Sequence, residues 1–189
     1  MRSYDYANRI GVEEITWERF PALAARLTVA LAAHNVDMVL GIARAGLFPA
    51  TAVACALRRE LYPVRVSRRV NDRVQYTRPV WHLGVTPGVA GKIVAVVDEI
   101  ADTGETLAMV ANRVREQNAR RVITATLVSH PWADPAPDIT ALVTDALVIF
   151  PWDKEVYENG RWQPHPELAE ALRLQKAAQS AADLPPDKD

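Results

Sequence analysis

The sequence has little that would mark a secreted or membrane protein. Cys55 is the only cysteine among 189 residues, which excludes a disulfide framework. It lies in the apolar run Ala50–Leu57, where we expect it to be a small core residue. No apolar run approaches the ~20 residues of a membrane-spanning helix. The first residues lack the apolar core of a signal peptide. We therefore expect a cytoplasmic protein without a membrane partner.

The chain also lacks an excess of charge of either sign. Its formal net charge is −1, so electrostatics give no reason to expect a nucleic-acid partner. Apolar residues make up 49% of the chain, which is an ordinary composition for a globular protein. A length of 189 residues fits one domain with a sizeable core.

Strand and helix patterns alternate along the chain. The predicted strands cover residues 36–42, 62–67, 93–97, 121–129 and 146–150. The predicted helices run from an N-cap at Thr16 to about Ala33 and over residues 48–59, 106–118 and 167–178. This alternation predicts a three-layer α/β fold with a central parallel sheet. Asn159-Gly160 predicts a tight hairpin turn, and residues 68–91 form a long segment without a clear pattern.

The most informative stretch is the one from Lys92 to Leu107. The apolar run Ile93–Val97 is typical of a buried parallel strand, and Asp98 and Glu99 follow it directly. Ligands of open α/β sheets bind beyond the carboxyl ends of such strands. The loop at 101–106 would open a helix, with backbone N–H groups and two hydroxyls for an anion. Acids beside a phosphate cradle indicate a sugar-phosphate site.

An ordinary solvated turn is the plainer interpretation of this stretch. In that case Asp102 or Thr103 would be an N-cap and nothing more. Two acids at the end of a buried strand argue against it, because buried charges are costly unless paired or ligated.

The stretch Val96–Leu107 resembles the phosphoribosyl pyrophosphate (PRPP) motif of the type I phosphoribosyltransferases. The stretch Gly41–Ala50 is similar to the pyrophosphate loop of that family. From Ile15 to about Tyr157 the layout looks most like xanthine-guanine phosphoribosyltransferases. The resemblance implies one phosphoribosyltransferase domain over residues 1–189, with a core at about 15–130. It also implies a small hood from residues 131–165 with the N-terminal segment, and a disordered tail at about 179–189.

The resemblance assigns roles on the PRPP side. Asp98 and Glu99 would bind the ribose hydroxyls, directly or through Mg²⁺. The 5-phosphate loop would consist of Ala101, Asp102, Thr103, Gly104, Glu105 and Thr106. Arg44 would hold the pyrophosphate, within a loop that contains Ala43, Ala45 and Gly46. Relatives often have a cis peptide before this arginine. Relatives usually have glycine where Ala45 stands. If the backbone at this position needs a positive φ, alanine would cost about 1 kcal/mol.

The resemblance also implies the acceptor. In 6-oxopurine enzymes an aspartate at the position of Asp102 takes the purine N7 proton as a general base. His130 stands where relatives place a lysine near the purine 6-oxygen, and a structural role for it is equally open. Leu147 or Val148 occupies the place of the usual stacking aromatic, for which Trp152 is an alternative. Asp153 would be a further Mg²⁺ ligand.

Residues 68–91 correspond to the mobile loop of the family, which closes over the site and excludes water. Four arginines of this segment are candidate phosphate contacts, although a solvated charged face is equally open: Arg68, Arg69, Arg73 and Arg78. Relatives are commonly dimers or tetramers, so we expect a homo-oligomer.

Two other functions stay open. The same PRPP site would serve an enzyme that modifies a different heterocycle. His130 in place of the usual lysine, and the absence of the usual stacking aromatic, favour this alternative. A PRPP-sensing regulator is the alternative without catalysis, but single-domain length and neutral charge count against it.

Overall fold

The computed structural model describes residues 9, 11–70 and 73–182. The chain divides into two compact units, one of residues 20–144 and one of residues 1–19 with 145–189. Residues 131–144, which we expected in the hood, belong to the larger unit. The predicted disordered tail is helical as far as Ala182, and its remainder lies outside the described residues.

The larger unit is built on a six-stranded sheet with the order β6-β3-β2-β7-β8-β9. Each neighbouring pair is parallel except β3 and β6, which are antiparallel. The sheet confirms the predicted α/β fold class. Its strands are β2 (Met38–Ala43), β3 (Glu60–Ser67), β6 (Val80–Leu83), β7 (Ile93–Ala101), β8 (Arg121–Ser129) and β9 (Ile139–Val143).

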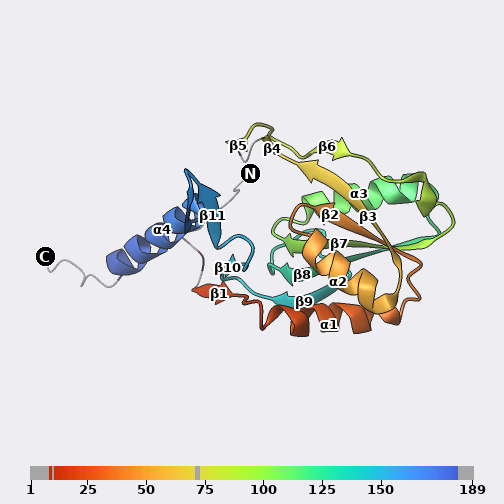
Figure 1. The fold of residues 1–189 in the computed structure, drawn as a ribbon, viewed down its shortest axis with the longest axis horizontal. Coiled ribbons are helices and arrows are strands. Elements are labelled where there is room, and N and C mark those ends of the chain that lie inside the picture. The colour runs from red at the N-terminus through yellow and green to blue at the C-terminus, as the bar shows by residue number, and fades with distance from the viewer. Residues whose placement is uncertain (1–8, 10, 71–72, 183–189) are drawn as a thin grey trace, which may run out of the picture. The chain divides into compact units, whose positions relative to one another are not determined.

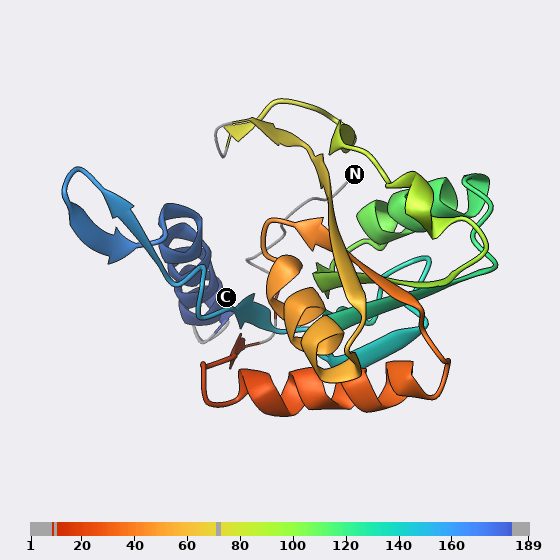
Figure 2. The ribbon, with the colours of Figure 1, turned by 45° about the vertical axis from the view of Figure 1, so that its right-hand side comes forward.

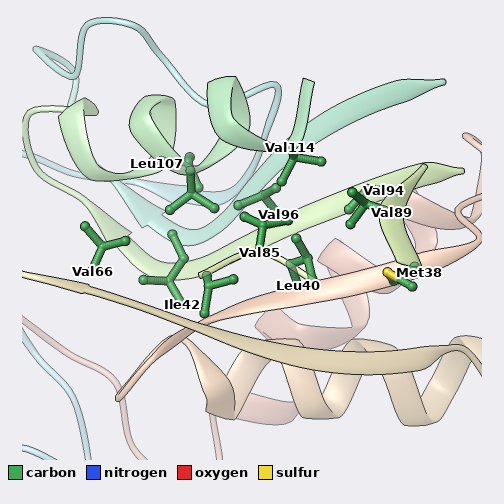
Figure 3. Close-up of a cluster of buried hydrophobic side chains, with 12 residues drawn as sticks. Met38, Leu40, Ile42, Val66, Val85, Val89, Val94, Val96, Leu107 and Val114 are labelled. Carbon is green, nitrogen blue, oxygen red and sulfur yellow. The ribbon is translucent and has the colours of Figure 1, made fainter. Parts of the chain in front are cut away.

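Three helices cover the two faces of this sheet (Figures 1 and 2). They are α1 (Phe20–Ala32), α2 (Leu47–Leu57) and α3 (Glu105–Glu116). Side chains alternate along a strand, so Met38, Leu40 and Ile42 of β2 point to one face, where they pack with α3 residues such as Leu107 (Figure 3). On the opposite face Gly41 allows α2 to approach, since a Cβ there would lie 2.8 Å from the Ala50 Cβ.

The strand β7 pairs over different lengths with its two neighbours. Its pairing with β2 ends at Gly41 and Val97, whereas its pairing with β8 continues to Ala101 and Ser129. The chain leaves β2 toward α2 on one face and leaves β7 toward α3 on the other. This is the topological switch point of the sheet, where α/β proteins bind ligands.

Several sequence expectations need correction. The segment from Arg68 to Gly91 is not irregular throughout, because it contains the edge strand β6 and three shorter elements. These are β4 (Arg69–Val70), β5 (Arg73–Val74) and η2 (Pro87–Val89). Strand β9 was also missed. Cys55 is exposed and not in the core, because the buried positions of α2 lie on its other side. An apolar helix without a polar face gives no periodic signal to distinguish its sides.

The smaller unit consists of two small sheets and a helix. Strand β1 (Val12–Glu14) pairs in parallel with β10 (Leu147–Ile149). The predicted hairpin is confirmed between β11 (Glu155–Glu158) and β12 (Arg161–Pro164), with a positive φ at Asn159 and Gly160. Helix α4 (Pro166–Ala182) is held by Gln175, whose amide donates to the Gly11 carbonyl at 3.1 Å. Among the described residues, no helix has the length and apolarity to cross a membrane.

Candidate functional site

Asp98 and Glu99 lie in the last part of β7, beyond the end of its pairing with β2. Asp98 is only 8% exposed, and its Oδ1 accepts a hydrogen bond from the Glu99 N–H at 2.9 Å. Burial, followed by repulsion from Glu99, raises the pKa of the Asp98 carboxyl well above its usual range. Two adjacent carboxyls of this kind would gain from a cation or from hydroxyl donors.

The predicted pyrophosphate loop lies directly against Asp98. A Cβ at Gly46 would lie 2.5 Å from the Ile42 carbonyl oxygen and 2.6 Å from Asp98 Oδ1, so this position requires glycine. The Ala43–Arg44 peptide is cis, as the resemblance implied. Ala45 has no positive φ, so the departure from glycine at this position carries no backbone strain. The strands β2 and β7 thus bring Arg44 and Asp98 to one end of the sheet.

The predicted 5-phosphate loop forms the turn from β7 into α3. Gly104 is the N-cap of α3 with φ +84°, and Thr103 Oγ1 accepts a hydrogen bond from the Glu105 N–H at 3.4 Å. The loop residues therefore stand at the N-terminus of a twelve-residue helix, whose unpaired N–H groups favour an anion.

A second loop, residues 130–137 after β8, packs against the predicted 5-phosphate loop. This contact was not predicted from the sequence. The Asp134 N–H donates to the Thr103 carbonyl at 3.0 Å. A Cβ at Gly104 would collide with the Pro135 carbonyl oxygen, and Pro135 itself follows a cis peptide. The prolines of this segment indicated a loop, but nothing local in the sequence indicates what it packs on.

Asp102 meets two aromatic side chains from this second loop. The Trp132 Nε1–H donates to Asp102 Oδ1 at 3.3 Å, and His130 Nε2 lies 4.0 Å from the same oxygen. The rings of His130 and Trp132 are stacked, with centroids 4.5 Å apart and planes 14° apart. His130 Nδ1 lies 2.6 Å from the Thr144 carbonyl oxygen. Sequence reasoning selected Asp102 and His130 but not Trp132.

Four further predicted site residues belong to the smaller unit. Leu147 and Val148 are in β10, and Trp152 packs between Trp17 and Phe150 at centroid distances of 5.9 and 5.0 Å. Asp153 follows Trp152, and its N–H donates to the Phe150 carbonyl at 3.1 Å. The roles of these residues toward a base or a metal stay predictions.

The arginines of the 68–91 segment lie in the larger unit. Arg69 and Arg73 are in the short hairpin of β4 and β5, Arg68 precedes it, and Arg78 is exposed. Their role as phosphate contacts also stays a prediction.

The family model of the phosphoribosyl transferase domain matches residues 13–159. The chain belongs to the type I phosphoribosyltransferase family. The match contains both predicted PRPP loops and extends over most of the chain. The match therefore shows that the protein is an enzyme of the phosphoribosyltransferase class.

Relatives of known name agree with this family. The chain is 30% identical over 147 residues to a xanthine-guanine phosphoribosyltransferase of Nitratidesulfovibrio vulgaris strain Hildenborough, covering 75% of this chain and 85% of the relative. The relative from strain DP4 of that species carries the same name and is 29% identical over the same coverage.

Solved structures share the fold. The purine phosphoribosyltransferase from Pyrococcus horikoshii Ot3 superposes with a TM-score of 0.68 at 28% identity, covering 76% of this chain and 94% of that one. The Helicobacter pylori xanthine-guanine-hypoxanthine phosphoribosyltransferase gives a TM-score of 0.59 at 15% identity, covering 86% and 99%, and shows the fold alone.

Proposed function

We propose that this phosphoribosyltransferase transfers the 5-phosphoribosyl group from PRPP to a 6-oxopurine, in purine salvage. The observation that carries the donor assignment is the meeting of three elements at one sheet end. The buried Asp98 lies against the loop of Arg44 and Gly46, the half-buried Glu99 follows Asp98 directly, and the N-terminus of α3 comes after the same strand. These elements suit the hydroxyls, the pyrophosphate and the 5-phosphate of PRPP, respectively.

We further propose that Mg²⁺ is bound by Asp98 and Glu99. Among residues 9, 11–70 and 73–182 no three acids, histidines or cysteines cluster to hold a metal by themselves. Mg²⁺ nevertheless fits, because it commonly takes one or two carboxylates and completes its shell with substrate phosphates and water. The ionised form of Asp98 is disfavoured by burial and then by repulsion from Glu99, so the carboxyl pair suits a hard cation. When bound, Mg²⁺ would supply positive charge toward the pyrophosphate, and Asp153 stays a predicted further ligand.

In the proposed reaction, a ring nitrogen of the base forms a bond to ribose C1 while the bond from C1 to the pyrophosphate oxygen breaks. The electron pair of that bond leaves with pyrophosphate, and the guanidinium of Arg44 would stabilise the developing charge. The base loses a ring N–H proton, which Asp102 would accept at its carboxylate. The products are a nucleoside monophosphate, pyrophosphate and one proton.

The proposal of a 6-oxopurine as the acceptor is supported by Asp102 and by the names of the relatives, which include xanthine-guanine enzymes. The second candidate acceptor is a different heterocycle. Leu147 and Val148 favour it, because neither is the aromatic residue that usually stacks on the purine in relatives. His130 is 4% exposed and its Nδ1 lies on the Thr144 carbonyl, which favours a supporting role over direct contact with the base. A cytoplasmic homo-oligomer is part of the same proposal.

Product analysis tests this proposal. The protein is incubated with PRPP and Mg²⁺ and with xanthine, guanine, hypoxanthine, adenine or orotate in turn, and nucleotides are identified by chromatography and mass. We expect monophosphates of 6-oxopurines, and none when EDTA replaces Mg²⁺. A nucleotide from adenine or orotate alone would favour the second candidate. Binding to DNA without any nucleotide product would favour a PRPP-sensing regulator.

A further inference from the structure

Trp132 combines exposure with an ordered environment. Its side chain is 46% exposed on the loop after β8, a place where a large apolar ring gains little from burial. The ring is nevertheless held on both its face and its edge. Its face stacks on His130 at 4.5 Å, and its Nε1–H donates to Asp102 Oδ1 at 3.3 Å. The contact partners, and not burial, determine where this ring lies.

His130 is a rigid support for that ring. It is buried, and its Nδ1 lies 2.6 Å from the Thr144 carbonyl oxygen. Because a carbonyl oxygen only accepts, Nδ1 carries the hydrogen. The His130 backbone N–H donates to the Ala101 carbonyl at 3.0 Å, and the Thr144 N–H donates to the Ser129 carbonyl at 3.1 Å. The histidine is thus tied to the residue that precedes Asp102.

The indole N–H of Trp132 lies closer to the Asp102 carboxylate than the imidazole of His130 does. Trp132 Nε1–H donates to Asp102 Oδ1 at 3.3 Å, whereas His130 Nε2 lies 4.0 Å from the same oxygen, beyond hydrogen-bond distance. The hydrogen bond from Trp132 favours the ionised carboxylate. A hydrogen bond to an ionised acceptor is stronger than one between neutral groups, and it also fixes the direction of the carboxylate.

We propose that Trp132 is a positioning residue for Asp102: its indole N–H, held in place by the stack on His130, orients the carboxylate that takes the proton of the base. The inference rests on the proposed function, in which Asp102 is the general base. A general base must lie within hydrogen-bond reach of the proton it removes. Asp102 stands on a turn that continues into an exposed Thr103 and the left-handed Gly104. A carboxylate on such a turn benefits from a side-chain anchor.

The test uses Trp132→Phe, which keeps an aromatic ring on His130 and removes the N–H. Trp162→Phe is the matched control, because Trp162 is 66% exposed in β12 and has no place in the machinery. We expect W132F to lower kcat about tenfold with the KM for PRPP unchanged, a part of the ~10²–10⁴-fold that a positioned base supplies. W162F should match the wild type. An unchanged kcat in W132F, or an equal loss in W162F, overturns the inference.

A double-mutant cycle separates positioning from a general structural effect. In an Asp102→Asn background we expect W132F to cause no further loss of kcat, because the base through which Trp132 acts is gone. A tenfold loss in both backgrounds would show that Trp132 acts independently of Asp102 and would overturn the inference. If D102N is slow while W132F equals the wild type, the inference fails and the proposed function stands.

A spectroscopic experiment tests the contact between Trp132 and Asp102 without requiring catalytic turnover. In ¹⁵N-labelled protein the Trp132 indole N–H resonance is assigned as the one missing in W132F. We expect Asp102→Ala to shift this resonance upfield by loss of its acceptor, with the other indole signals in place. An unmoved Trp132 signal overturns the inference. If the wild type has no activity with any base but the resonance shifts, the contact is real and the failure lies in the proposed function; the role of Trp132 in positioning a general base is then rejected with it.

Discussion

Gly46 lies so close to Asp98 that no side chain fits between them. A Cβ at position 46 would be 2.6 Å from Asp98 Oδ1 and 2.9 Å from Asp98 Cα. The φ of Gly46 is −60°, which any residue can adopt, so glycine is needed here for space alone. This contact joins the loop predicted to hold pyrophosphate to the acids predicted to hold the ribose.

Gly46→Ala should therefore damage both the fold and the binding of PRPP. Backbone atoms of Ile42 and Asp98 would have to move, at a cost of about 1–3 kcal/mol in the free energy of unfolding. We expect a lower Tm and at least a tenfold weaker Kd for PRPP by calorimetry. Gly84→Ala is the control, because a Cβ at Gly84 meets no atom within 4 Å. Equal behaviour of the two variants would contradict the account.

Gly104→Ala tests the contact of the phosphate loop with the second loop. Gly104 and Gly160 both have positive φ, at +84° and +78°, but only at Gly104 would a Cβ meet another segment, the carbonyl of Pro135. Each substitution should cost about 1 kcal/mol for the strained backbone. Only G104A should add a steric cost and abolish measurable PRPP binding. The affinity of G160A for PRPP serves as the reference.

Asp98→Asn should stabilise the protein without ligands while removing its affinity for PRPP. Burial and Glu99 raise the pKa of Asp98, so its ionised form is less favourable in the folded state than in the unfolded state. That penalty is present at pH 7 and absent below the ordinary pKa of aspartate, where the carboxyl is protonated in both states. Asparagine keeps an oxygen for the Glu99 N–H. A Tm increase of about 2–4 °C at pH 7, the effect of ~1 kcal/mol, is expected by calorimetry in EDTA.

Arg44→Lys should raise the KM for PRPP about tenfold. Lysine keeps the charge but loses the planar pair of donors that matches a phosphate face. Arg59→Lys, at an exposed position after α2, is the control for the same change of side chain. If steady-state kinetics give the same KM in both variants, Arg44 does not hold the pyrophosphate.

The sequence predicted the parts of the fold that have strong periodicity or a buried apolar run. Strand β8 was predicted with its observed bounds, and the two segments predicted to bind PRPP follow β2 and β7 as expected. β6 and β9 were missed because each is short and only half buried, next to segments rich in proline or charge. The strand β7 extends to Ala101 because β8 continues to pair with it, which is a tertiary effect.

Contacts between distant segments could not be predicted. Trp132 reaches Asp102 across 30 positions of the chain, and the packing of Pro135 on Gly104 depends on how two loops cross. The spacing of these residues follows neither the helix nor the strand period. The backbone angle of Ala45 likewise follows from the geometry of its loop and not from residue type.

The central claim is that the chain transfers phosphoribose to a 6-oxopurine with Asp102 as the general base. Its most direct test is the initial rate of pyrophosphate release from PRPP with guanine, xanthine or hypoxanthine, measured for the wild type and Asp102→Asn together. We predict release by the wild type and a kcat about 100-fold lower in the variant, with the Kd for PRPP unchanged. No release with any of the three bases, or equal rates in the two proteins, would contradict the account.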